Sequence, residues 1–229
     1  MTSFRTMPQR HLLTDQVRDY IRIGIAEGRF LPGDSFREGD IADSLKVSRT
    51  PIREAVRILE TEGLIAREPW KGITIASLSH KQISNFYNFR EIIEGVAAEM
   101  AANLITDDDI ERLRKILELL KHGFEKSWFK MGRENEQFHE MIFDIAGNKY
   151  LKKSEQVINT AKILIRKPVY RNYERWKEAQ VEHRKIFNAL RARDPIAAKA
   201  AAREHARNSG FHRVAVIASE ELELYEPEC

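Results

Sequence analysis

Apolar side chains recur every three or four residues along most of this chain, the spacing that places them on one face of a helix. Beyond residue 80 this spacing predicts six consecutive helices, at about residues 83–104, 106–120, 126–146, 150–165, 173–191 and 194–219. Thr106 and Asp109 mark one start as a capping box, with Asp in place of the usual Glu. Short links make neighbouring helices antiparallel, so this part of the chain is predicted to be an all-α bundle.

The beginning of the chain shows a different pattern, in which three helices precede two short strands. Helical spacing predicts helices at about residues 12–25 and 38–45, and a third from about residue 49. Residues 64–67 and 73–75 are strand candidates with a turn between them. Short helix, tight turn and helix predict a helix-turn-helix whose second helix enters the DNA groove, and the hairpin would be a wing beside it.

The pattern changes at residues 76–80, ASLSH, which we interpret as the domain boundary. The predicted fold is mainly α, with an N-terminal winged helix-turn-helix over residues 1–78 that carries a small β-hairpin wing. A C-terminal all-α helical bundle follows over residues 79–229. A chain of 229 residues is long enough for two domains of this size, each with its own core.

Three arginines give the third N-terminal helix its chemistry. At about 100° per residue, Arg49, Arg53 and Arg57 fall within an arc of about 80°, while the apolar residues turn to a neighbouring side. One face can therefore be buried while the adjacent face offers three guanidinium groups. Arginine makes bidentate contacts with phosphate or with the O6/N7 edge of guanine, so this helix is predicted to read the major groove.

The start of the same helix is also suited to an anion. Pro51 fits the first turn, and either Ser48 or Thr50 supplies a capping hydroxyl. Helix N-termini favour negative charge. The alternative is a solvated charged face, which an isolated row of three arginines usually means, but the preceding short helix and the following hairpin favour DNA contact.

Composition limits the class of protein but does not reveal its function. Hydrophobic residues make up 42% of the chain and charged residues 32%, a globular balance, and the formal charge of +3 is too small to indicate DNA binding without the arginine cluster. No apolar run is long enough to cross a membrane and no signal peptide is evident, so a cytoplasmic protein is expected. The single cysteine, Cys229, excludes an intrachain disulfide and a CxxC metal site.

Four polar residues lie among apolar ones in the predicted bundle. Asn135 and His139 are four residues apart and share a helix face, whereas His183 and His205 lie in the apolar stripes of two further helices. Three imidazoles from three helices can converge in a bundle core and bind a divalent transition metal such as Zn or Ni, with Asn135 adding an oxygen. The alternative is three core histidines that hydrogen-bond to neighbours or water.

Arg90 lies in an apolar stripe, which is an unusual place for an uncompensated charge. One interpretation is a helical ion pair with Glu94, four residues further on. The other is that Arg90 points into the bundle and binds a carboxylate in bidentate fashion, and both can hold at once. A metal and an arginine in an apolar interior would select small organic acids.

Over nearly its whole length the chain resembles bacterial transcription regulators of the GntR family. Residues 31–75, with VSRTPIREAVRILETEGLI and the ending KGITI, are similar to the winged helix-turn-helix of that family. The later phrases FREIIEGVAAEMAA, NEQFHEMIFDIAGN, EHRKIFNAL and AAREH resemble its FCD type of ligand-binding domain, in the six-helix, VanR-like form.

The resemblance implies roles for individual residues of the first domain. Arg49 and Arg53 would reach DNA from the recognition helix, with Thr50 and Gly72 near it. Family members often carry Arg where this chain has Gly39, and Arg37 is a candidate to replace that contact. The complete set expected to contact DNA is Arg37, Ser48, Arg49, Thr50, Arg53, Arg57, Lys71 and Gly72.

For the second domain the resemblance implies a metal site. Many FCD members use three histidines at the positions of His139, His183 and His205, with Asp or Asn at the position of Asn135. Asn carries no charge and would leave the site more positive than Asp does. The likeness also favours Arg90 as the residue that binds the effector.

Together these features predict a ligand-responsive regulator and not an enzyme, most often a repressor in this family. A homodimer would bind a palindromic double-stranded operator, and a small carboxylic acid effector in the metal-containing bundle would alter that binding. The alternatives are a metal-dependent hydrolase with a DNA-tethering module and a ligand-free DNA-organising protein. The histidine segments carry no HExxH motif, and Glu140 and Glu182 are expected to point away from the histidines, which argues against the hydrolase.

Overall fold

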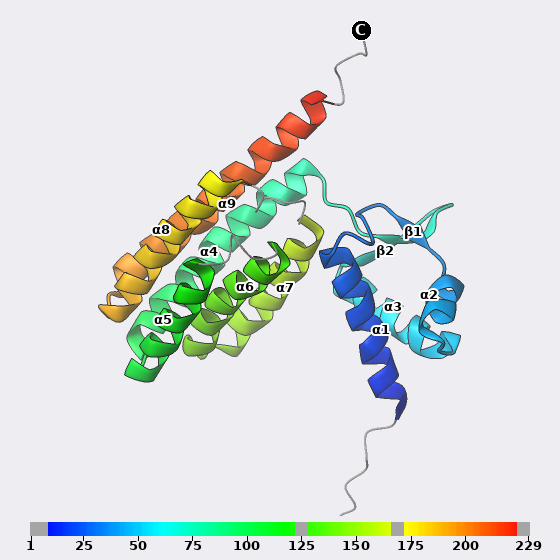
Figure 1. Ribbon diagram of the computed structural model, residues 1–229, viewed down its shortest axis with the longest axis horizontal. Coiled ribbons are helices and arrows are strands. Elements are labelled where there is room, and N and C mark those ends of the chain that lie inside the picture. Colours follow the sequence, from blue (N-terminus) through cyan, green and yellow to red (C-terminus); the bar gives the residue numbers. More distant parts are fainter. Residues whose placement is uncertain (1–8, 122–127, 166–171, 224–229) are drawn as a thin grey trace, which may run out of the picture. The chain divides into compact units, whose positions relative to one another are not determined.

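The computed structural model describes residues 9–121, 128–165 and 172–223. The chain divides into two compact units, which we describe separately (Figure 1). Unit 1 holds residues 1–78 together with 159–166, and unit 2 holds residues 79–158 together with 167–229. Among the described residues, no helix has the length and apolar character needed to cross a membrane.

Unit 1 contains the predicted three helices and hairpin and one strand that the pattern did not reveal. Its elements are α1 Gln9–Ala26, β1 Ser35–Phe36, α2 Glu38–Leu45, α3 Arg49–Thr61, β2 Ile65–Glu68 and β3 Gly72–Ile75. The strands form an antiparallel sheet in the order β1-β3-β2, so the hairpin strand β3 lies in the middle. Ser35 pairs with Thr74 on one side of β3, and Ile65 pairs with Ile75 on the other.

The core of unit 1 fixes the orientation of α3. Ile52, Val56 and Leu59 are fully buried on one side of this helix, together with Val17 and Ile21 of α1. Between α2 and α3 the chain turns at a left-handed residue, Lys46, whose neighbouring Val47 N–H donates to Ala42 O at 3.1 Å. This tight turn and the packed apolar face direct the opposite, arginine-bearing side of α3 to solvent.

Unit 2 is built from helices, as predicted. The described elements beyond residue 78 are α4 His80–Leu104, α5 Asp107–Lys121, α6 Trp128–Ile145, α7 Lys149–Ile165, α8 Tyr173–Arg191 and α9 Pro195–Glu223. The end of α7, from residue 159, is counted with unit 1. The first residues of the helix predicted at 126–146 lie outside the described residues. The last helix continues four residues beyond its predicted end at residue 219.

Two helix starts show why the boundaries lie where they do. Thr106 and Asp109 form the predicted capping box: Asp109 N–H donates to Thr106 Oγ1 at 3.2 Å, and Thr106 N–H donates to Asp109 Oδ2 at 3.2 Å. Ser79 and Gln82 form a second box at the start of α4. Each box satisfies backbone donors that the first helical turn leaves without a carbonyl partner.

The longest helices of unit 2, α4 and α9, lie side by side, and α8 packs along α9 (Figure 1). Gly210 of α9 permits the close approach, because a Cβ there would lie 2.9 Å from Cγ of Tyr87. Across the same pair of helices, Arg203 and Arg207 of α9 both bind Glu91 of α4. The inward sides of α4, α8 and α9 carry the polar groups described next.

Candidate DNA interface and metal centre

The structure places all eight residues of the predicted DNA-contacting set on the surface of unit 1. Arg49, Arg53 and Arg57 are exposed along α3, opposite its buried apolar residues. Lys71 is exposed in the turn of the wing between β2 and β3, and Gly72 is exposed as the first residue of β3. Their exposure is consistent with an interface for a DNA duplex, and their contacts with DNA stay a prediction.

Two neighbouring residues position the arginines. Arg53 Nε donates to Glu38 Oε2 of α2 at 3.0 Å, which orients a side chain that is otherwise largely exposed. A Cβ at Gly39 would lie 3.9 Å from Nη2 of Arg49, an ordinary contact distance, so this position lies directly beside Arg49. Position 39 therefore lies beside the guanidinium of Arg49 but contributes no guanidinium of its own.

The prediction that a side-chain hydroxyl caps the start of α3 is wrong. Ser48 is the N-cap residue by its extended backbone, but its side chain makes no capping hydrogen bond. An N-cap oxygen usually binds the N–H of the second or third helical residue. Here the third residue is Pro51, which has no N–H, and this removes one of the two usual donors.

The wing ends in an aromatic residue. Trp70 is fully exposed and has a left-handed φ of 69°. Beside it, Lys71 Nζ lies 3.0 Å from Glu68 Oε2. Left-handed backbone is uncommon for bulky residues, so the turn holds Trp70 in a conformation that its side chain does not favour.

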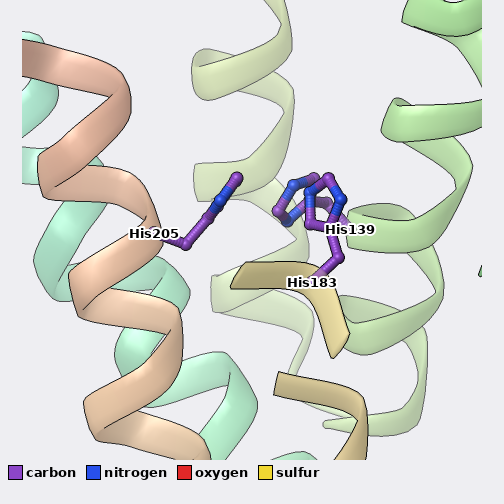
Figure 2. A group of neighbouring side chains, drawn as sticks. All are labelled: His139, His183 and His205. Atoms are coloured by element: carbon purple, nitrogen blue, oxygen red, sulfur yellow. The ribbon is translucent and has the colours of Figure 1, made fainter. Parts of the chain in front are cut away.

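The three predicted histidines meet in the interior of unit 2. His139 of α6, His183 of α8 and His205 of α9 point toward one another, as Figure 2 shows. One ligand-capable nitrogen from each lies within 4.8 Å of the others, and the three residues are at most 5% exposed. The predicted convergence is therefore confirmed, although the binding of a metal is not shown by it.

His183 is the most enclosed of the three. It is 1% exposed and packs against the ring of Phe138, with ring centroids 5.0 Å apart. Neither of its ring nitrogens has a hydrogen-bond partner among the described residues. Burial, with a smaller contribution from His205, lowers the pKa of His183 well below its ordinary value, so the ring is neutral near pH 7.

His205 is held from behind by a carboxylate. Its Nδ1 lies 2.8 Å from Oε2 of Glu182. Burial lowers the pKa of His205, although the bond to Glu182 opposes this change, so the imidazole is neutral near pH 7 and Nδ1 carries its hydrogen. An imidazole held in this way presents the lone pair of its other nitrogen, as metal-ligating histidines do.

The position of Glu182 corrects the expectation that it points away from the histidines. Glu182 is buried, and it accepts two hydrogen bonds from Arg175 at 2.8 Å and one from Asn208 at 2.7 Å, in addition to His205. Burial opposes its ionisation, but the hydrogen bonds from His205 and Arg175 outweigh that effect and hold the pKa of Glu182 well below its usual range. The carboxylate is therefore charged.

Arg90 and Glu94 of α4 form a buried ion pair beside the histidines. Arg90 Nε lies 2.6 Å from Glu94 Oε1, and both residues are at most 5% exposed. Arg90 Nη2 also lies 3.3 Å from Nε2 of His205, and Glu94 Oε2 lies 3.8 Å from Nδ1 of His139. The helical pair is thus confirmed, but in the interior instead of on the surface.

Asn135, the fourth predicted ligand, is half-buried one turn before His139 on α6. Its role as an oxygen ligand stays a prediction. Sequence reasoning missed Arg175 and Asn208 as supports of the histidine cluster. The seven-residue spacing of Arg175 and Glu182, which places an opposite charge pair on one face of α8, is the signal that points to this pair.

The first unit is a winged helix with an exposed row of arginines, and the second is a helical unit with a buried histidine cluster. This combination is that of a DNA-binding transcription regulator with two domains. The chain belongs to the GntR family of bacterial regulatory proteins. Residues 13–75 match that family and residues 85–208 match the FCD domain. It is accordingly a transcription regulator with an FCD effector-binding domain, and not an enzyme.

Related proteins support the same class. The chain is 32% identical over 179 residues to the uncharacterized HTH-type transcriptional regulator YdhC of Bacillus subtilis strain 168, covering 76% of this chain and 79% of that protein. It is 30% identical over 199 residues to the probable D-xylose utilization operon transcriptional repressor of Paenarthrobacter nicotinovorans, covering 86% of each. The structure of Escherichia coli McbR/YncC matches with a TM-score of 0.77 at 20% identity, over 96% of this chain and all of the other, and so shares its fold.

Proposed function

We propose that this regulator binds a divalent transition metal and a small organic acid in its helical unit, and that the acid weakens the binding of a homodimer to a palindromic operator. Residues 1–78 would be the DNA-binding domain and residues 79–229 the domain for ligand binding and dimerisation. The observation that carries the proposal is the meeting of three buried imidazoles, one of which has no hydrogen-bond partner among the described residues.

The residues suit a transition metal. Neutral imidazole is a good ligand for Zn and Ni, and burial keeps His183 and His205 neutral at a pH where an exposed histidine is partly charged. Glu182 fixes the ring of His205, as carboxylates behind ligating histidines commonly do. The three histidines would hold the ion and Asn135 would add a neutral oxygen.

The charge of such a centre favours an acid as the effector. Four neutral ligands leave the charge of a divalent ion uncompensated, and this charge would attract a carboxylate group. Arg90 lies beside His205 and offers planar donors that fit a carboxylate in bidentate fashion. Both features act in a buried environment, where electrostatic attraction is stronger than in water.

In this proposal, the exposed surface of α3 and the wing binds the operator. Two copies related by two-fold symmetry would place two α3 helices in successive major grooves of a palindromic site. Repression is supported by the relative that is named a probable transcriptional repressor. An acid can change operator binding only if it binds two dimer geometries with different affinity.

Two measurements test the proposal. Chelator-treated protein should recover one divalent ion per chain on incubation with Zn²⁺ or Ni²⁺ and should then melt at a higher temperature, because a ligand that binds only the folded state stabilises it. In a mobility-shift titration on an operator selected from random duplexes, the metal-loaded protein should lose affinity with at least one member of a panel of small carboxylic acids. No uptake of metal, or no response to any acid, would contradict the corresponding half of the proposal.

A further inference from the structure

The guanidinium of Arg90 lies between a buried carboxylate and the histidine cluster. It binds Glu94 through two contacts, Nε to Oε1 at 2.6 Å and Nη2 to Oε2 at 3.2 Å. The same Nη2 lies 3.3 Å from Nε2 of His205, on the neighbouring helix α9. Arg90 therefore connects Glu94 of α4 with His205 of the histidine cluster.

The roles of the two His205 nitrogens follow from their partners. The Glu182 carboxylate accepts hydrogen bonds only, so Nδ1 of His205, 2.8 Å away, carries the hydrogen. Nε2 faces Arg90 Nη2 at 3.3 Å, where it can only accept, so it holds a lone pair. Arginine can only donate, so Arg90 Nη2 donates its hydrogen to that lone pair. This lone pair is the one that His205 would offer to an ion.

We propose that Arg90 is an internal competitor of the metal: its guanidinium holds Nε2 of His205 when the centre is empty, and a metal ion binds only by displacing it. The inference rests on the metal centre proposed above and deepens it by assigning its regulation. Arg90 acts here as a positioning residue, with Glu94 as its anchor.

Displacement has a consequence for the acid effector. One lone pair serves one partner, so a metal on Nε2 leaves a donor of Arg90 without its acceptor in a buried site, where an unmade hydrogen bond is costly. A carboxylate group can accept that hydrogen and a second one from the same planar group. Metal and acid should consequently favour each other's binding, by the same factor in both directions.

The competing explanation is that Arg90 and Glu94 form only a structural ion pair, and that His205 is an incidental neighbour. The two explanations differ in what happens to metal affinity when the pair is removed. A structural pair supports the site, so its loss should leave affinity unchanged or weaken it. A competitor opposes the metal, so its loss should strengthen binding.

The decisive variant is the double substitution Arg90→Met and Glu94→Gln in the full-length protein. It removes the guanidinium without changing the net charge of the pair, so any gain cannot come from exposing an uncompensated carboxylate to the ion. Replacing a buried ion pair with uncharged residues of similar size is often neutral for folding. Melting in chelator checks this, and R90K, whose shorter cation reaches His205 and Glu94 less well, serves as a second variant.

The readout is the affinity for Zn²⁺, measured by competition with a chromophoric zinc chelator. The R90M/E94Q variant should bind zinc about tenfold more tightly than the wild type, the expected gain when a hydrogen bond from a charged donor no longer has to be broken. R90K should show a smaller gain. The matched control is R203M, which removes an arginine from an exposed pair with Glu91 on the same two helices and should bind zinc like the wild type.

The outcomes separate this inference from the proposed function. If zinc binding depends on His183 and R90M/E94Q binds zinc as tightly as the wild type or more weakly, the proposed competition is refuted while the proposed metal centre stands. Zinc binding by neither protein overturns both. Tight, His183-dependent binding by the double variant alone would establish the competition in its strongest form.

Discussion

Substitution of His183 by Leu should make the metal-free protein more stable while abolishing its response to metal. His183 is 1% exposed and its two ring nitrogens have no hydrogen-bond partner among the described residues. A buried polar group without a partner costs about 1–3 kcal/mol. Leucine has a similar size, removes the polar atoms and keeps the packing against Phe138, 5.0 Å away between ring centroids.

The magnitude follows from two opposing contributions. Relief of the polar penalty gives about 2 kcal/mol, and imperfect repacking of a different shape returns about 1 kcal/mol. The net gain of about 1 kcal/mol corresponds to a melting temperature about 3 °C higher for a chain of this size. Zinc at about a hundred times its dissociation constant should stabilise the wild type by about 2.7 kcal/mol, and H183L by much less.

The assay is thermal unfolding of both proteins with chelator and with Zn²⁺. The expected signature is a crossing: H183L melts above the wild type in chelator and below it in zinc. H212L is the matched control, because His212 lies at the surface, 3.0 Å from Glu178 and outside the cluster, and its zinc response should equal that of the wild type. A lower melting temperature for H183L in chelator, or an undiminished zinc shift, would refute the reasoning.

Three further predictions concern other parts of the molecule. The exposed Arg53 should contact DNA, so R53A should weaken operator binding about tenfold or more without changing the melting temperature, as measured by mobility shift and thermal unfolding. Hydrogen bonds from Arg207 lower the pKa of Glu91 below the usual 4.5, so its stabilising effect is complete above about pH 4.5 and is lost as the pH falls below it. E91Q should therefore lower the free energy of unfolding by less than about 1 kcal/mol at pH 7, seen as a slightly lower melting temperature, and should have no effect near pH 3. An equal difference at both pH values would show that the charge of Glu91 is not the cause. G210A should destabilise unit 2 by about 1 kcal/mol, since its Cβ would meet the Tyr87 ring at 2.9 Å, and unchanged calorimetric unfolding would show that the helices can separate at no cost.

The helices could be predicted from the sequence because their signal is repeated many times. Each helix of unit 2 is described by several apolar positions at helical spacing, and the Thr106–Asp109 box fixed one start. Strand β1 was missed because two residues, Ser35 and Phe36, are too few to show the alternation of a strand. Its existence depends on pairing with β3, which lies almost forty residues further along the chain.

The histidine cluster could be predicted in part. His139, His183 and His205 each lie in an apolar stripe, and helical stripes face a common core, so periodicity allows the three to meet. The resemblance to the FCD domain is what favoured a cluster over three separate core histidines. The role of Glu182 does not follow, because α8 is covered on two sides and its buried arc is wider than one stripe. The packing of α9 against α8 decides which carboxylate reaches His205. The periodicity of a single helix gives no information about that packing.

The middle position of β3 in the sheet has a mechanical consequence. Because β3 is bonded to β2 on one side and to β1, just before α2, on the other, the wing cannot swing as a loose flap. We therefore expect helix α3 and the wing to move together as one body. Under the proposed function, an acid effector would therefore have to move the recognition helix and the wing together on the operator, instead of detaching the wing alone.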